Sequence, residues 1–174
     1  MIDALRELLS PWYLYIKAIH VFAMMAWVWS TSVAYAFYLV PIFKAWRRNP
    51  GDPDIVRARN WAIERFDEGA TYEHVAFPLI LVSGPLLYIA GGWNTGVGWL
   101  MLKLLIVFGI FLPIEVMDYY LSHGPWGKLR LRLAGDPVAY ETAIHRHWWF
   151  LLVTSPTVMI FAFAIVFLAV VRPI

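Results

Sequence analysis

Four long apolar stretches alternate with polar connections along the chain, at residues 11–43, 73–90, 99–121 and 148–171. A helix needs roughly 20 apolar residues to cross the hydrocarbon layer of a membrane. The pattern therefore predicts an all-α integral membrane protein, built as a four-transmembrane-helix bundle. The first stretch is longer than a bilayer requires, so we expect it to tilt or to project, with Pro41 near its end.

The connections between these stretches differ in character. Residues 91–98 form a short glycine-rich link, which makes the second and third spans an antiparallel hairpin. Residues 44–72 begin with a turn cluster and then carry apolar side chains at helical spacing, namely Ile55, Ala62, Ile63 and Phe66. That spacing predicts an amphipathic helix lying on the membrane surface within the first charged loop.

Composition narrows the classes of function. The 174 residues are 61% hydrophobic and their mean hydropathy is +0.62, so the lipid bilayer is the expected partner. Four spans and their loops leave no room for a separate soluble domain, and residues 1–174 are expected to form a single transmembrane domain. The absence of cysteine excludes thiolate metal sites, iron–sulfur clusters and disulfides. A formal net charge of +2 gives no basis for nucleic-acid binding.

The distribution of basic residues predicts the orientation in the membrane. Lysine and arginine are abundant in the loop after the first span and in the loop before the last, whereas the 91–98 link has none. Cytoplasmic loops carry such an excess of basic residues. We therefore expect both charged loops to be cytoplasmic, and both termini to be periplasmic in a bacterial inner membrane.

One stripe of the first predicted helix carries polar side chains at a spacing of about 100° per residue. It consists of Lys17, His20, Met24, Trp27, Thr31 and Tyr38. An ionisable residue inside a span indicates a functional site by default, so we expect the stripe to face the interior of the bundle. In this interpretation it lines a pocket for a flat, largely apolar cofactor.

Each residue type on the stripe suits such a cofactor. His20 is a candidate axial ligand for haem iron. Trp27 and Met24 would pack on the macrocycle, and Lys17 or Lys103 would pair with propionates or supply a second ligand. In the alternative interpretation, His20 hydrogen-bonds to a neighbouring helix and both lysines extend to the membrane interface.

A second group of ionisable residues is predicted at the cytoplasmic side. Its candidate site residues are His74, Glu115, Asp118 and His145. The other members of the group are Glu64, Asp67, Glu68, Glu73, His123, Glu141 and His147. Glu115 lies in an otherwise apolar helix and needs a partner, for which His74 or an arginine of the first loop would serve. Carboxylates and histidines together indicate a possible metal site, a proton path or a substrate gate. The group is equally compatible with ordinary residues at the membrane interface.

Three stretches resemble the HemJ family of membrane protoporphyrinogen oxidases, which is related to the CopD-like membrane proteins. The first is Tyr13-Leu-Tyr-Ile-Lys17-Ala-Ile-His20-Val with the following Ala26-Trp27. The second is Ala90-Gly-Gly-Trp93 with Gly98-Trp99-Leu-Met-Leu-Lys103, and the third is Ser155-Pro156-Thr157 with Val170-Val171-Arg172-Pro173. Within this resemblance His20 and Lys103 match the histidine of the first helix and the lysine of the third helix.

The resemblance implies a haem b protein of the bacterial inner membrane that oxidises protoporphyrinogen IX to protoporphyrin IX. The chain departs from the family at Leu39–Lys44, where an arginine and a histidine are replaced. Two alternatives therefore remain beside an oxidoreductase with tetrapyrrole as its partner. One is a non-catalytic, cytochrome b-like subunit of a larger redox complex or a homo-oligomer, and the other is a CopD-like metal permease.

Overall fold

The computed structural model describes residues 2–93 and 96–173, which form helices joined by short loops, with no strand among them. In chain order the helical segments are α1 (Ile2–Leu9), η1 (Ser10–Trp12), α2 (Tyr13–Ala34), η2 (Tyr35–Leu39), α3 (Val40–Arg48), α4 (Pro53–Ala90), α5 (Gly98–Ile106), η3 (Val107–Phe111), α6 (Leu112–Ser122), α7 (Lys128–Leu133) and α8 (Pro137–Val171).

These segments join into helices that are long and apolar enough to cross a membrane. Within the described residues there are four such helices, Ile2–Arg48, Pro53–Ala90, Gly98–Ser122 and Pro137–Val171. The prediction of an all-α membrane protein with a four-helix bundle is therefore confirmed.

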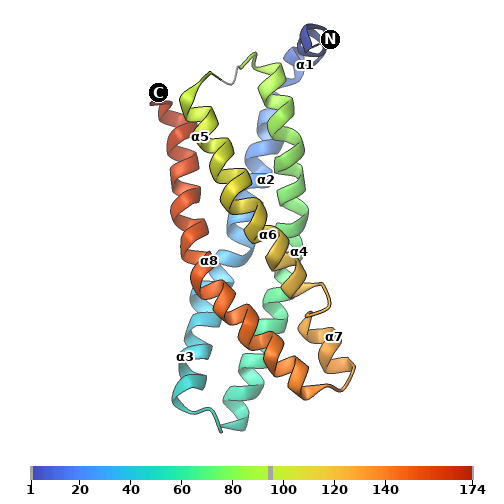
Figure 1. Ribbon diagram of the computed structural model, residues 1–174, viewed down its shortest axis with the longest axis vertical. Helices are drawn as coiled ribbons and strands as arrows, with labels where there is room; N and C mark the ends of the chain where they lie inside the picture. Colours follow the sequence, from blue (N-terminus) through green and yellow to red (C-terminus); the bar gives the residue numbers. More distant parts are fainter. Residues whose placement is uncertain (1, 94–95, 174) are drawn as a thin grey trace.

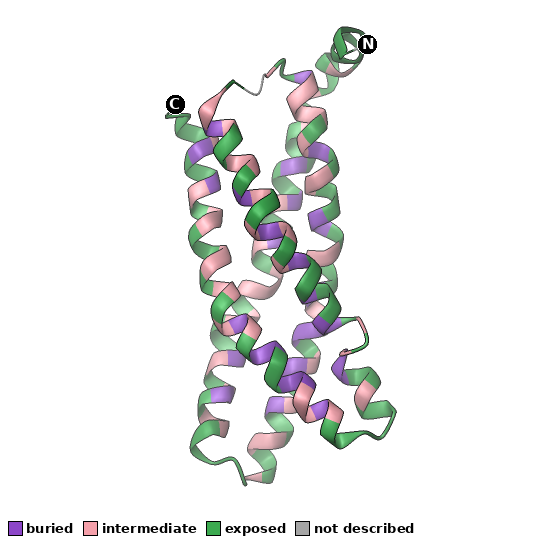
Figure 2. Ribbon diagram, viewed as in Figure 1, coloured by how far each residue is buried: buried purple, intermediate pink, exposed green. Residues whose placement is uncertain are grey.

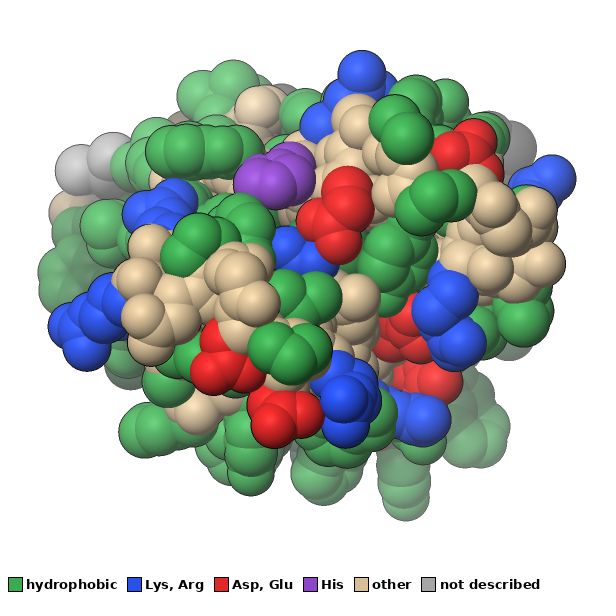
Figure 3. Space-filling model, turned by 90° about the horizontal axis from the view of Figure 1, so that it is seen from below, with side chains coloured by type: hydrophobic (Ala, Val, Ile, Leu, Met, Phe, Trp, Pro, Cys, Tyr) green, Lys and Arg blue, Asp and Glu red, His purple; other side chains and the backbone are tan. Residues whose placement is uncertain are grey.

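The long helices run side by side along one axis, as Figure 1 shows. Both termini and the connection between α4 and α5 lie at one end, called here the outer end. The turn between α3 and α4 lies at the opposite, inner end, and α7 lies toward that end. Helix α2 packs chiefly along α4, while α8 packs against α5, α6 and α7. Charged side chains gather on the inner end, which Figure 3 views directly.

Helix α4 departs from the expected boundaries. It begins at Pro53, where the Asp52 side chain accepts hydrogen bonds from the backbone N–H groups of Asp54 and Ile55, and it continues without interruption to Ala90. The amphipathic helix expected in the first loop exists, but it is the first part of this long helix. Its apolar face, including Ile63 and Phe66, is buried in the bundle. The expectation that it lies on the membrane surface is therefore wrong.

Two apolar cores fill the bundle, one toward each end, and Figure 2 shows buried residues along its whole length. The core nearer the inner end contains Phe43, Ile63 and Trp148, and the other contains Trp27 and Phe111. Phe43 is fully buried, and its ring stacks on that of Trp148 with a centroid distance of 4.0 Å and an interplanar angle of 9°. These contacts fasten α3 to α8.

Two of the described helices contain a turn of π-helix, and each turn ends two residues before a proline. Segment η2 precedes Pro41 and segment η3 precedes Pro113. Proline lacks an N–H group, and its ring clashes with the carbonyl of the residue four positions earlier. In both helices that earlier residue lies inside the π-turn, where the wider backbone accommodates the clash.

The π-turn also corrects one prediction about the polar stripe. Tyr38 lies within η2 and is exposed, while Leu39 beside it is fully buried. The prediction that Tyr38 faces the interior is wrong, because it assumed regular α-helical spacing along the whole stripe. The additional residue in the π-turn shifts every position that follows.

The length of α4 determines how far the inner end extends relative to the membrane. Helix α4 has 38 residues, which corresponds to about 57 Å at 1.5 Å per residue. The hydrocarbon core of a bilayer is only about 30 Å thick. When the outer end of α4 lies at one membrane surface, its first part therefore extends beyond the other surface. The core around Phe43 belongs to this extension.

We expect Phe43→Ala to lower the free energy of unfolding by about 3–5 kcal/mol, because it removes a buried aromatic ring and leaves a cavity. Phe37→Ala is the matched control, since Phe37 is 73% exposed and faces away from the core. Chemical denaturation of the purified protein in detergent micelles measures both. Equal losses in the two variants would contradict the assignment of Phe43 to the core.

Candidate functional site

His20 lies on α2 and contacts α4 through a hydrogen bond. Its Nδ1 is 2.8 Å from Oγ of Ser83, and Oγ of Ser83 donates to the carbonyl oxygen of Leu79 at 2.5 Å. A serine hydroxyl has one hydrogen, so Ser83 accepts from His20 and the hydrogen of the neutral imidazole is on Nδ1. Nε2 then carries a free lone pair, and it has no hydrogen-bond partner among the residues that the structure describes.

The surroundings of His20 combine one glycine with two of the predicted residues. A Cβ placed on Gly84 would lie 3.7 Å from Cε1 of His20, so the ring rests close to the backbone of α4. Lys103 of α5 is close enough to interact electrostatically with His20. Met24 is half-buried and packs against the core that contains Trp27. These residues form the outer site.

Lys17 and Trp27 do not lie where the cofactor interpretation of the stripe expects them. Lys17 is exposed on α2 and points out of the bundle, as expected for a lysine that extends to the interface. Trp27 is buried, and its ring packs against the rings of Phe77 and Phe111 at centroid distances of 5.4 and 4.8 Å. Its Nε1 donates to Oε2 of Glu115 at 2.9 Å. Trp27 is therefore the partner that Glu115 required.

A line of ionisable side chains continues from Trp27 toward the inner end, and we call it the inner polar cluster. Its members are Asp67, Glu73, His74, Glu115, Asp118, Lys128 and His147. At its membrane end, Oε2 of Glu73 accepts from Thr31 Oγ1 at 2.5 Å. The carboxyl groups of Glu73 and Glu115 are close enough to interact electrostatically.

Asp118 occupies the centre of the inner polar cluster. Its Oδ2 lies 3.3 Å from Nε2 of His74 and accepts from the hydroxyl of Ser122, while its Oδ1 lies 2.9 Å from Nε2 of His147. The side chains of Asp118 and His74 are each 6% exposed, and that of His147 is fully buried. A single carboxylate therefore joins α4, α6 and α8 within the bundle.

Lys128 closes the cluster from outside the membrane-spanning helices. Its ammonium group is fully buried and lies 2.7 Å from Oδ1 of Asp67 and 3.2 Å from the carbonyl oxygen of Leu121. It also donates to Nδ1 of His147, so the ring hydrogen that remains is on Nε2, which faces Asp118. Burial lowers the pKa of Lys128 from its ordinary value, and the neighbouring Asp67 opposes this shift.

A cavity of about 490 Å³ adjoins the cluster at the inner end. It is lined by residues of α4, α6 and α7, among them Asp67, Ser122 and His123. The ring of His123 lies 5.0 Å from that of His74, centroid to centroid. Burial lowers the pKa of His123 below its ordinary value of 6.5, and the nearby His74 adds to this effect.

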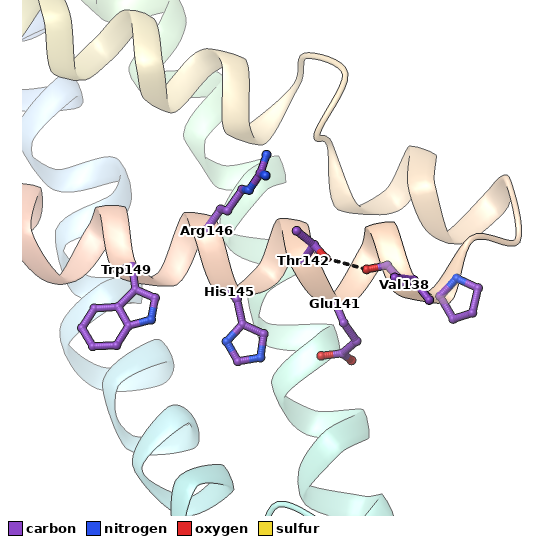
Figure 4. Close-up of a pocket in the computed structure, with 7 residues that line it drawn as sticks. Val138, Glu141, Thr142, His145, Arg146 and Trp149 are labelled. Atoms are coloured by element: carbon purple, nitrogen blue, oxygen red, sulfur yellow. Dashed lines mark hydrogen bonds between the residues drawn. The ribbon is translucent and has the colours of Figure 1, made fainter.

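His145 lies apart from His74, Glu115 and Asp118, the residues with which the sequence analysis had grouped it. It is exposed on α8, where its ring lies 5.2 Å from that of Trp46, centroid to centroid. With Glu141 and Trp149 it lines a separate groove along α8, shown in Figure 4. Within the described part of the chain, no group of three or more His, Asp or Glu side chains is arranged to hold a metal ion.

Sequence reasoning had grouped every member of the cluster except Lys128, and helical spacing supports the interior position of two of them. His147 follows Ala143 and Ile144 at the spacing of the buried face of α8. Asp67 continues the face of α4 that also contains Ile63. Helical periodicity therefore placed both side chains toward the interior. Lys128 had no such signal, because a loop and the short helix α7 bring it to the cluster.

No protein-family model, curated protein or solved structure matches this chain. The fold therefore defines its class, a multi-pass, all-α membrane protein, and any assignment of function depends on the two sites described above.

A double-mutant cycle tests the buried ion pair between Lys128 and Asp67. We expect Lys128→Met and Asp67→Asn each to lower the free energy of unfolding by about 3–5 kcal/mol, because each leaves the other partner buried and unpaired. The double variant should lose less than the sum of the single losses. Chemical denaturation in micelles gives all four values. Arg130→Met is the control, since Arg130 is exposed on the same helix.

The lowered pKa of His123 predicts how stability depends on pH. In the unfolded chain His123 takes up a proton near pH 6.5, whereas the folded protein does so only at lower pH. Between these values the unfolded state holds more protons, so acidification favours it. From about pH 7.5 to about 5.5, the wild type should lose thermal stability relative to His123→Gln. Parallel profiles of the two proteins would contradict this prediction.

Proposed function

We propose that this chain is a haem b-binding membrane protein with a role in redox chemistry, and that His20 is an axial ligand of the haem iron. The observation that carries the proposal is the hydrogen bond between Nδ1 of His20 and the hydroxyl of Ser83, from which we infer the tautomer. Its Nδ1–H is held by Ser83, so the lone pair of Nε2 is available to a metal. Histidine ligands commonly donate the other ring N–H to a fixed acceptor, which orients the ring and raises its basicity.

The other residues of the outer site have supporting roles. Met24 offers an apolar surface on the same helix as His20, and Lys103 brings a cation close to it. That cation suits a propionate carboxylate or, as a neutral amine, a second axial position. Bound haem would supply reversible one-electron transfer. The protein's own contribution would be to orient the ligand and to exclude water, because His20 is only 9% exposed.

We place the protein in a bacterial inner membrane with both termini in the periplasm. The support is the distribution of basic residues, because α3, the first part of α4 and the segment around α7 lie toward the inner end and carry most of the lysines and arginines. In this orientation the outer site lies about two helical turns below the periplasmic ends of α2 and α4.

An absorption spectrum of the purified protein tests the proposal. After expression with an adequate haem supply, the wild type should show a Soret band, which His20→Ala should abolish because the iron loses its ligand. Ser83→Ala should weaken haem binding by about 10- to 100-fold, the usual effect of losing the partner of a histidine ligand. His145→Ala is the control, since His145 is exposed and remote from the outer site.

The same preparation separates the more specific possibilities. Haem together with oxidation of protoporphyrinogen IX to protoporphyrin IX supports an oxidoreductase that acts on a tetrapyrrole. Haem without that activity, in a protein that co-purifies with redox subunits, supports a cytochrome b-like component. A wild-type protein with no haem signal would overturn the proposal.

A further inference from the structure

The inner polar cluster extends from a cavity into the interior of the bundle. It starts at Asp67, which lines the cavity at the inner end, and finishes at the hydrogen bond between Glu115 and Trp27. Burying several charged groups in a membrane protein is costly, and such residues often mark ion or proton pathways. The outer site is separate from this line, because His20 lies about two turns beyond Trp27 on α2.

Each group at the cavity end is suited to exchange protons. Asp67 is 8% exposed and lies 2.7 Å from the ammonium group of Lys128. Lys128 donates to Nδ1 of His147, and Nε2 of His147 faces Oδ1 of Asp118 at 2.9 Å. A proton that arrives on Nδ1 allows the proton on Nε2 to move to Asp118. The ring thus passes on one proton for each one it receives and is left with its hydrogen on Nδ1. A flip of the ring about its Cβ–Cγ bond restores the first tautomer before the next transfer.

The line continues beyond Asp118 through His74. Nε2 of His74 lies 3.3 Å from Oδ2 of Asp118. Both ring nitrogens of His74 and Oε1 of Glu115 are buried, and none of the three atoms has a hydrogen-bond partner in the described part of the chain. His74 also interacts electrostatically with Glu115. Unsatisfied polar atoms of this kind are typical positions for an internal water molecule, and one bridging water would complete the connection.

The carboxyl pair at the membrane end is a suitable proton acceptor. Glu73 and Glu115 are close enough to interact electrostatically, and a proton held by either carboxyl group removes the repulsion between two buried negative charges. The pair is fixed from both sides, by Thr31 on Glu73 and by Trp27 on Glu115. It therefore has a defined place for one proton, and its neighbours on the line are groups that also gain and lose protons.

We propose that the inner polar cluster conducts protons between the cavity at Asp67 and the Glu73–Glu115 carboxyl pair. The proton moves from Asp67 to Lys128, His147, Asp118 and His74 in turn, and each donor is protonated again by the group before it. This function goes beyond haem binding and does not depend on it.

A purely structural role predicts a different behaviour of the same residues. As a structural network, the cluster would hold α4, α6, α7 and α8 together, and its loss would change stability alone. As a pathway, it also sets the rate at which a proton reaches the buried carboxyl pair. The rate of protonation, measured on folded protein, therefore separates the two roles.

Time-resolved infrared spectroscopy of the protein in lipid nanodiscs measures this rate. A flash releases protons from a caged compound, and the carbonyl stretch of protonated carboxyl groups reports their arrival. The part of this signal that Glu73→Gln and Glu115→Gln remove belongs to the pair. Asp118→Asn keeps the shape of the side chain but cannot carry a proton, so it should slow this signal by about 100-fold.

Two further variants keep the experiment decisive. Lys128→Arg preserves a cation beside Asp67, but arginine stays protonated, so it should slow the signal as Asp118→Asn does. It provides the test if Asp118→Asn does not fold. Glu141→Gln is the matched control, because Glu141 forms a 2.5 Å ion pair with buried Arg59 outside the cluster. A wild-type rate in folded Asp118→Asn or Lys128→Arg, or no carboxyl signal assignable to Glu73 and Glu115, would overturn the proposal.

Discussion

The structure depends on one constraint, that polar groups buried inside a membrane bundle must find their partners within the protein. Three helices contribute to the solution around Asp118, whose carboxylate contacts His74 of α4 and His147 of α8. Because an unpaired charge there would be costly, these contacts fix how the helices are rotated about their axes. Apolar packing alone leaves such rotations poorly specified, since lipid tails are as apolar as the side chains of the bundle.

Apolar contacts and polar contacts therefore stabilise different parts of the bundle. The ring stack of Phe43 and Trp148 joins α3 to α8 beyond the membrane, where burial of apolar surface drives association. Within the membrane, the hydrogen bonds of His20 to Ser83 and of Trp27 to Glu115 connect α2 to α4 and to α6. The two candidate sites are thus also the places where the spanning helices hold one another, which explains why their polar residues tolerate burial.

The number of helices and their membrane-spanning character could be predicted from the sequence, because an apolar stretch of about 20 residues is typical of a transmembrane helix. Local spacing also identified His20 as an interior residue. The position of Tyr38 did not follow, since the π-turn before Pro41 depends on how the proline clash is relieved. Only some members of the inner polar cluster could be predicted from the sequence. His147 lies on a periodic buried face, but the contact between Lys128 and Asp67 joins residues far apart in sequence and depends on tertiary structure.

The origin of Lys128 has a consequence for assembly. Its ammonium group touches Asp67 on α4 and His147 on α8, yet it is carried by α7, which lies outside the spanning helices. The full set of contacts requires the second and fourth spans to lie side by side. The position of one lysine on a short peripheral helix thereby couples the packing of α7 to the spacing of two spanning helices.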